Sequence, residues 1–337
     1  MSSSLSHVQR GRWRMALVTV VLCVTLAVAG CAAAPTPTSA PVARPLPVVA
    51  TTTILGDVVA AVGGEAIALT VLMPIGAEPH SFQPTPRDVA TLTGAALVFV
   101  NGFGLEEGLL PLIESSVPSE RIVAVSEGIT PLAGEEARGH EEDADTHKHE
   151  EATPAEEVGH THPVDPHTWL DPNNVIVWTR TIAQALAQAD PAHRADYEAR
   201  AQAYIAELEA LDAWIRQEVA TIPPAKRLLV TDHRVFGYFA QRYGFEQLGA
   251  VIPGFSTLAE PSAQELAALE DAIRAAGVKA VFVSTTVSPG LVERVARDTD
   301  IRLLILYTHS LSEADGPAAT YLDLMRYNVR TIVEGLR

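Results

Sequence analysis

Cysteine is nearly absent from this chain of 337 residues, and both of its cysteines, Cys23 and Cys31, lie near the N-terminus. The rest of the chain therefore offers no pair of thiols for a disulfide and no thiolate for a metal site. A metal ion bound there must be held by nitrogen and oxygen atoms. Basic residues are also few, 24 Lys and Arg against 41 Asp and Glu. Because a surface that binds phosphate backbones is basic, this balance argues against nucleic acid as a partner.

The sequence signatures of several enzyme classes are missing. The chain has no HExxH sequence, since the position that would complete it after His140 and Glu141 is Ala144. It also has no GxSxG and no Walker loop, and the glycines of GFGLEEG at 102–108 miss the GxGxxG spacing. A secreted zinc hydrolase stays open as an alternative, and turnover of an ester or peptide by the purified protein would support it.

One long apolar run occurs, at residues 15–29, and its length of about 15 residues is short of the roughly 20 that span a bilayer. Three arginines precede the run, and small residues lead from it into Cys31. This arrangement predicts an export signal at 1–30 with a lipobox-like ending, so that cleavage leaves a lipid on Cys31. The alternative is an uncleaved anchor helix. Both interpretations place the body of the chain outside the cytoplasmic membrane.

Two further segments are set apart by composition. Residues 31–45 are rich in proline and small residues and predict an extended tether. Residues 134–164 form an acidic, His-rich loop that has too few apolar residues to build a core of its own. We expect this loop to collect zinc weakly near the main site, and the alternative is a solvated insert without such a role. It holds five of the eleven histidines: His140, His147, His149, His160 and His162.

The remaining sequence predicts an α/β fold. Short apolar runs rich in β-branched residues alternate with helical segments, which is typical of βα units around a mainly parallel sheet. Two similar halves, 46–190 and 225–337, are the simplest interpretation. The predicted strands lie at 46–54, 67–74, 95–101 and 121–126 in the first half and at 227–232, 279–285 and 302–308 in the second.

A long amphipathic helix is predicted between the two halves. Apolar side chains recur at steps of three and four from Tyr197 to Val219. Asp190 and Pro191 provide an expected N-cap and first turn, and a Pro-Pro pair follows the last turn. We expect this linking helix within 191–222. About 29 residues of helix are roughly 43 Å long, which is enough to span both halves.

Four histidines lie outside the signal, the acidic loop and the long helix: His80, His167, His233 and His309. His233 and His309 each follow a predicted strand directly, and the loops at the carboxyl ends of strands line the ligand site in open α/β sheets. His80 and His167 lie in loops stiffened by prolines. A single histidine of this kind is more often a surface residue than a ligand, but two in each half favour a shared site. Four imidazole nitrogens suit a tetrahedral Zn²⁺ ion.

The sequence around these histidines resembles the metal-binding lipoproteins of ABC importers for zinc and manganese. The resemblance covers nearly the whole mature chain and is carried by GAEPHSFQPTPRDVATLTGAALVFVNGFGLE, DPHTWLDPNN, TDHRVFGYFAQRYGF and YLDLMRYNVRTIVEGL. It implies a metal cleft between two lobes joined by one long helix, with ligands at His80, His167 and His233. Histidine at the third position is similar to the zinc-type members, whereas manganese-type members often have Glu there. At the fourth position the family commonly has Asp, and this chain departs from the pattern with His309.

We therefore predict a monomeric, membrane-tethered receptor without catalytic activity that captures Zn²⁺ and passes it to an ABC permease. The expected ligands are the four loop histidines, with Mn²⁺ as the alternative ion and a surface adhesin as the alternative role. Asp165, Asp171 and Asp232 lie near these ligands in the sequence and are candidates to accept hydrogen bonds from their imidazoles.

Overall fold

The computed structural model describes residues 44–133 and 164–337. The predicted export signal, the lipid site at Cys31, the tether up to residue 43 and residues 134–163 of the acidic loop lie outside the described residues. Within the described ranges, no helix is both long enough and apolar enough to cross a membrane.

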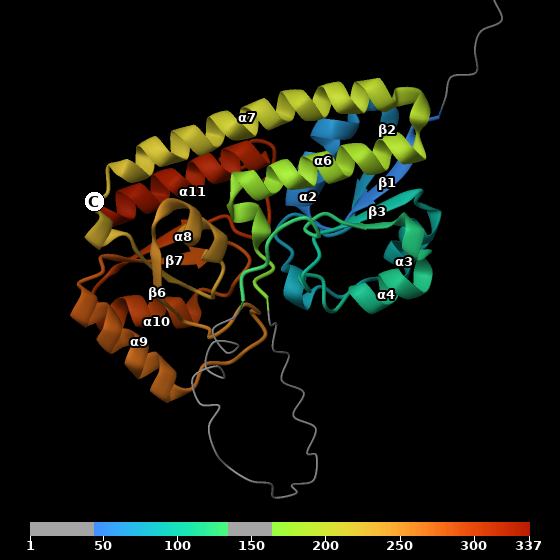
Figure 1. Ribbon diagram of the computed structural model, residues 1–337. Coiled ribbons are helices and arrows are strands. Elements are labelled where there is room, and N and C mark those ends of the chain that lie inside the picture. The colour runs from blue at the N-terminus through green and yellow to red at the C-terminus, as the bar shows by residue number, and fades with distance from the viewer. Residues whose placement is uncertain (1–43, 134–163) are drawn as a thin grey trace, which may run out of the picture. The chain divides into compact units, whose positions relative to one another are not determined.

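The first lobe is built on a four-stranded, fully parallel sheet in the order β2-β1-β3-β4 (Figure 1). All four residues of β3 are buried, as expected for a parallel strand whose two faces are both covered. The strands are β1 (Leu46–Ala50), β2 (Ile67–Val71), β3 (Leu97–Val100) and β4 (Ile122–Ala124), and the helices between them are α2 (Thr53–Gly63), α3 (Pro86–Gly94) and α4 (Leu110–Ser116).

The second lobe repeats this plan with the order β6-β5-β7-β8, again fully parallel. Strand β6 was not predicted from the sequence. It is an edge strand whose sequence, EQLGA, has one buried residue and two polar ones. An edge strand of this kind carries little of the apolar signal on which the prediction depends. The strands are β5 (Leu228–Thr231), β6 (Glu246–Ala250), β7 (Ala280–Ser284) and β8 (Arg302–Leu306), and the helices are α8 (Gly237–Tyr243), α9 (Ala263–Ala276) and α10 (Gly290–Thr299).

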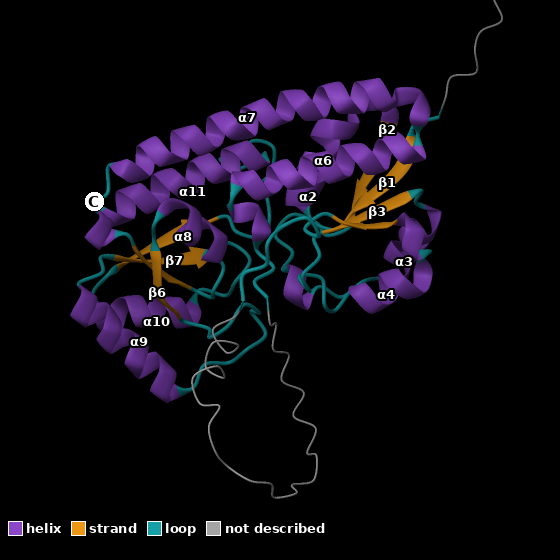
Figure 2. Cartoon of the chain, viewed as in Figure 1, coloured by secondary structure: helices purple, strands orange, loops and turns teal. Residues whose placement is uncertain are grey.

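The longest helices of the described residues are α6 (Pro172–Ala189), α7 (Arg194–Ala220) and α11 (Tyr321–Leu336), and α7 connects the lobes. Figure 2 shows α7 running along both lobes, and it packs against α6 and α2 on the first lobe and against α11 on the second. Its 27 residues correspond to about 40 Å. The α/β class and the long connecting helix are therefore as predicted.

The start of α7 differs from the prediction. The helix begins at Arg194, because Pro191–His193 forms a separate 3₁₀ turn. Asp190 does not cap the backbone of the helix. Its carboxylate instead lies 2.6 Å from His193 Nδ1 and accepts a hydrogen bond from the Tyr197 hydroxyl at 2.9 Å. The Asp-Pro pair therefore predicted the start of the helix to within three residues. Asp190 acts there through contacts with side chains and not as a cap of the helix backbone.

One hydrophobic cluster extends through both lobes. It contains Phe99 of the first sheet, Leu208 of α7 and Phe282 of the second sheet, all of them buried. The two sheets are therefore joined by a continuous core along α7, and the site described next lies where their strand ends meet.

Candidate metal centre

The two histidines of the first lobe lie in loops that are held by short turns. Pro79–Ser81 forms a 3₁₀ turn that contains His80, and Glu78 precedes this turn with its side chain facing the His80 backbone N–H. His167 directly precedes a second 3₁₀ turn, Thr168–Leu170, which leads into α6. Proline at the first position of the turn Pro79–Ser81 has a backbone angle suited to the start of a helical turn.

The two histidines of the second lobe follow strands. His233 comes two residues after β5 ends, and His309 comes three residues after β8 ends. Because β5 and β8 both pair with β7 in a parallel sheet, their carboxyl ends lie at the same edge of that sheet. The sheet topology thus places two imidazoles close together although they are far apart in the sequence.

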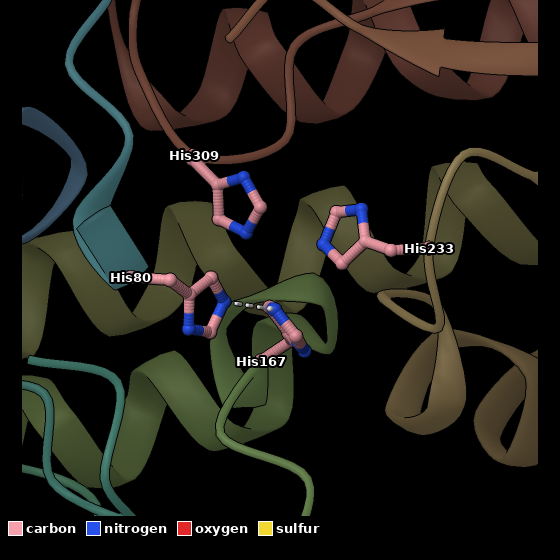
Figure 3. Close-up of side chains that lie close together, drawn as sticks. All are labelled: His80, His167, His233 and His309. Carbon is pink, nitrogen blue, oxygen red and sulfur yellow. Dashed lines mark hydrogen bonds between the residues drawn. The ribbon is translucent and has the colours of Figure 1, made fainter. Parts of the chain in front are cut away.

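The four predicted histidines converge at the junction of the lobes (Figure 3). All four are buried, and one nitrogen of each lies within 4.8 Å of the corresponding nitrogen of every other. The Nε2 atoms of His80 and His167 are 3.3 Å apart. Two nitrogens bound at 2.0–2.1 Å to a tetrahedral zinc ion would be about 3.3–3.4 Å apart. This pair therefore already has the spacing of two ligands on one ion, and the wider spacings require only a small inward movement.

Aspartates orient two of the imidazoles. Asp165 Oδ1 lies 2.8 Å from His167 Nδ1, and Asp232 Oδ1 lies 2.8 Å from His233 Nδ1. The backbone N–H of Ser284 donates to Asp232 Oδ2 at 2.6 Å and holds this carboxylate in place. An acceptor at Nδ1 selects the tautomer whose Nε2 lone pair faces a metal and increases the basicity of that nitrogen.

Asp171, the third aspartate that the sequence analysis suggested, does not have this role. It caps α6 through the backbone N–H of Asn173 at 2.9 Å and accepts a hydrogen bond from Arg242 at 2.7 Å. Glu78 was not predicted from the sequence, and its Oε2 lies 3.2 Å from His309 Nδ1. A signal was available, because Glu78 stands before Pro-His just as Asp165 does in the second ligand loop.

Burial and charge shift the pKa values around the cluster. Burial raises the pKa of Asp165 to about 8, and the hydrogen bond from the His167 backbone only partly opposes it. Burial also disfavours the charged form of His233, but the Asp232 carboxylate outweighs this effect and raises the pKa of His233. Burial acts against the charged form of Glu78 too, but the positive charge and hydrogen bond of His309 outweigh it, so the pKa of Glu78 falls well below its usual range.

The buried Nε2 atoms of His233 and His309 have no hydrogen-bond partner among the residues that the structure describes. A buried polar atom without a partner costs free energy, so native structures rarely leave one unless a ligand completes it. A divalent cation at the centre of the cluster would accept electron pairs from both. The donor set therefore fits a metal ion.

The fold and this cluster define a two-lobed α/β protein with a buried, nitrogen-rich cation site between its lobes. The chain belongs to the family described as zinc-uptake complex component A, periplasmic, whose sequence profile matches residues 48–335.

Individual relatives agree with this assignment. The manganese-binding lipoprotein MntA of Halalkalibacterium halodurans is 33% identical over 318 residues, which are 94% of this chain and 97% of the relative. The metal ABC transporter substrate-binding lipoprotein ScbA of Streptococcus cristatus is 31% identical over 300 residues, 86% of this chain and 89% of the relative. Among solved structures, the periplasmic zinc-binding protein TroA of Treponema pallidum has a TM-score of 0.75 and 28% identity, covering 87% of this chain and 99% of that one.

These findings give the class of the protein. It is an extracytoplasmic metal-binding receptor of an ABC import system, and its family is one of solute-binding transport proteins and not of enzymes. The relatives are named for different metals, so membership of the family does not identify the ion.

Proposed function

We propose that this protein captures Zn²⁺ through His80, His167, His233 and His309 and delivers it to the permease of an ABC importer. The observation that carries the proposal is the composition of the cluster. Among the described residues it consists of four imidazoles, each of which offers one nitrogen to a common centre. Zinc binds such nitrogens in tetrahedral sites. Because its d shell is filled, the d electrons impose no other preferred geometry.

Manganese is the second candidate, and the name of a relative favours it. The chemistry of the site favours zinc over manganese for two reasons. Imidazole suits zinc, whereas Mn²⁺ prefers carboxylate, carbonyl and water oxygens. For a given set of nitrogen ligands, the affinity also rises from Mn²⁺ along the series of divalent first-row metals, and Zn²⁺ is bound more tightly than Mn²⁺.

The position of the cluster supports a role in capture and release. We propose a division into a first lobe at 46–190, a linking helix at 191–222 and a second lobe at 225–337, with two ligands from each lobe. An ion held by both lobes is released only when the ligands of one lobe move away from those of the other. A permease that separates the lobes would therefore receive the ion. We further propose that lipid on Cys31 holds the receptor at the membrane surface where this transfer takes place.

The test is a measurement of metal content and competition on purified protein without an affinity tag. We expect one tightly bound Zn²⁺ per chain, which an excess of Mn²⁺ or Fe²⁺ does not displace. The control is His167→Ala, which removes one central imidazole and should abolish tight binding. Tight binding of Mn²⁺ in the presence of equal Zn²⁺, or a His167→Ala variant with unchanged zinc affinity, would contradict the proposal.

A further inference from the structure

The carboxylate of Glu78 lies between the two lobes. Its Oε1 faces the backbone N–H of His80 at 3.4 Å, on its own lobe. Its Oε2 lies 3.2 Å from His309 Nδ1 and accepts a hydrogen bond from the Thr286 hydroxyl at 2.7 Å, both on the other lobe. A single side chain therefore contacts the first and the last of the four proposed ligands, and a hydroxyl of the second lobe holds it in this place.

The other two carboxylates at the cluster are arranged differently. Asp165 and Asp232 each accept from a histidine that is one or two residues away on the same lobe. The hydrogen bonds of these two carboxylates to the imidazoles are local and join residues of the same lobe. The contact between Glu78 and His309 forms only when the lobes are together, because the two residues belong to opposite lobes.

We propose that Glu78 is a positioning residue for His309 and thereby raises the zinc affinity of the site. Three oxygens lie near His309 Nδ1: Glu78 Oε2 at 3.2 Å and the hydroxyls of Thr286 and Thr308 at 3.3 and 3.4 Å. Glu78 is the one charged acceptor of the three, so it favours the tautomer whose Nε2, buried and without a hydrogen-bond partner among the described residues, faces the ion. Its negative charge lies beside the Nδ1 atom of His309, on the side of the imidazole ring that faces away from the proposed metal position. The imidazole thus remains the donor to the metal, and the carboxylate increases the basicity of that donor.

This inference rests on the proposed function, since it assumes that His309 binds the metal. It makes Glu78 the reason that a neutral imidazole can stand as the fourth ligand. The strength with which His309 binds the metal then depends on the lobe interface. When the lobes separate, Glu78 moves away from His309, and His309 becomes a weaker ligand.

The variant that tests the inference is Glu78→Gln, which keeps the size of the side chain and removes its charge. Loss of an acceptor behind a metal ligand typically lowers affinity by about 10–100-fold, and we expect a loss of zinc affinity in this range. The visible absorption of bound Co²⁺ should change as well, because it reports the geometry of the ligands around the ion.

The matched control is Glu107→Gln, which removes another first-lobe carboxylate that contacts the second lobe, through the Ser256 hydroxyl at 3.3 Å. It should leave zinc affinity within about twofold, as expected for a polar contact at a partly exposed position.

A double-mutant cycle with His309→Ala separates positioning from other roles. If Glu78 acts through His309, then Glu78→Gln causes no further loss of zinc affinity in the His309→Ala background. An equal loss in both backgrounds would overturn the inference, because Glu78 would then act as a direct ligand or as a structural cap of the turn that contains His80. Unchanged zinc affinity and an unchanged Co²⁺ spectrum for Glu78→Gln would also overturn it.

The same experiments distinguish this failure from failure of the proposed function. If the unmodified protein binds zinc tightly and His167→Ala does not, the proposed function stands whatever Glu78→Gln shows. If the unmodified protein does not bind zinc tightly, both proposals fail together.

Discussion

Three carboxylates surround the four imidazoles, and their charges decide which protons the metal must displace. Glu78 and Asp232 have lowered pKa values and are charged at neutral pH. Burial raises the pKa of Asp165 to about 8, so this group is mostly protonated at neutral pH in the metal-free protein. Burial acts against the charged form of His233, but the Asp232 carboxylate outweighs it and raises the pKa of His233. A metal ion binds neutral imidazole and favours charged carboxylates nearby, so binding competes with these protons.

We therefore expect zinc affinity to rise with pH until about 8, the pKa of Asp165, and to fall steeply below roughly pH 6, because a metal ion must compete with protons for imidazole nitrogens and free imidazole has a pKa of about 6.5. The sign follows from the raised pKa values, because protonated forms are stable in the free site and must be lost on binding. Calorimetry at pH 7 in two buffers with different ionisation enthalpies measures the released protons directly. A constant affinity between pH 7 and pH 5 would contradict binding dominated by histidine.

His309 is the position where this chain departs from the common pattern of the family that it resembles. We expect His309→Ala to weaken zinc binding by more than the roughly 10–100-fold effect of losing an outer acceptor, because it removes a proposed ligand. His309→Asp should keep zinc binding while it narrows the preference over Mn²⁺, because it restores an oxygen ligand. Equilibrium competition with a chromophoric chelator measures both effects. His193→Ala, in the turn before α7, is the control, and an equal effect of this change would contradict a role for His309 as a ligand.

At the scale of elements, two loops at the site are fixed by contacts across the lobes. The indole N–H of Trp169, two residues after His167, donates to the carbonyl of Thr308 at 2.7 Å, directly before His309. The start of α8 also packs closely on the loop that contains Asp165, since a Cβ atom on Gly237 would overlap Asp165 Oδ2. A glycine is thus required at this helix start so that the aspartate can reach its histidine.

Gly237→Ala should accordingly displace Asp165 and weaken zinc binding by about tenfold or more, the usual effect of disturbing an acceptor behind a ligand. The matched control is Gly290→Ala, also at the first position of a helix, where a Cβ atom would have nothing within 4 Å. This control should bind zinc normally, and a titration of each variant decides the matter. Equal affinities for the two variants would show that Asp165 does not need this close approach.

The acidic loop between Ala133 and Val164 begins and ends at one place, because these two residues pair as an isolated antiparallel bridge. Deletion of residues 136–162 leaves three residues to connect them, a length that natural hairpins use. We expect the deletion to preserve the tight zinc site, since its four ligands lie outside the deleted segment. Calorimetry should show that only weaker additional zinc equivalents disappear. Loss of the tightest binding event would instead assign that event to the loop.

At the scale of the whole molecule, the continuous hydrophobic cluster joins the lobes into one cooperative unit. Because zinc is bound by ligands of both lobes, it should stabilise the whole protein and not one lobe. At a free zinc concentration about 1,000 times the Kd, linkage adds roughly 4 kcal/mol to the free energy of unfolding. For a protein of this size we expect one melting transition whose midpoint rises by roughly 10 °C with zinc.

Differential scanning calorimetry with and without zinc checks this expectation, and His167→Ala serves as the control that should show little shift. Two separate transitions, of which only one responds to zinc, would show that the ligands of a single lobe suffice for binding.

By itself, the sequence determined the α/β class, the long connecting helix and the four loop histidines, because periodicity and composition act over short stretches of chain. The tertiary structure alone decided that these histidines meet at one centre and that β6 completes the second sheet. It also decided that the carboxylate of Glu78 lies 3.2 Å from the Nδ1 atom of His309, on the opposite lobe. Glu78 is held by Thr286, which is 208 positions away. No local pattern encodes such a contact, since it depends on how two lobes pack along α7, and only the folded chain brings these side chains within hydrogen-bonding distance.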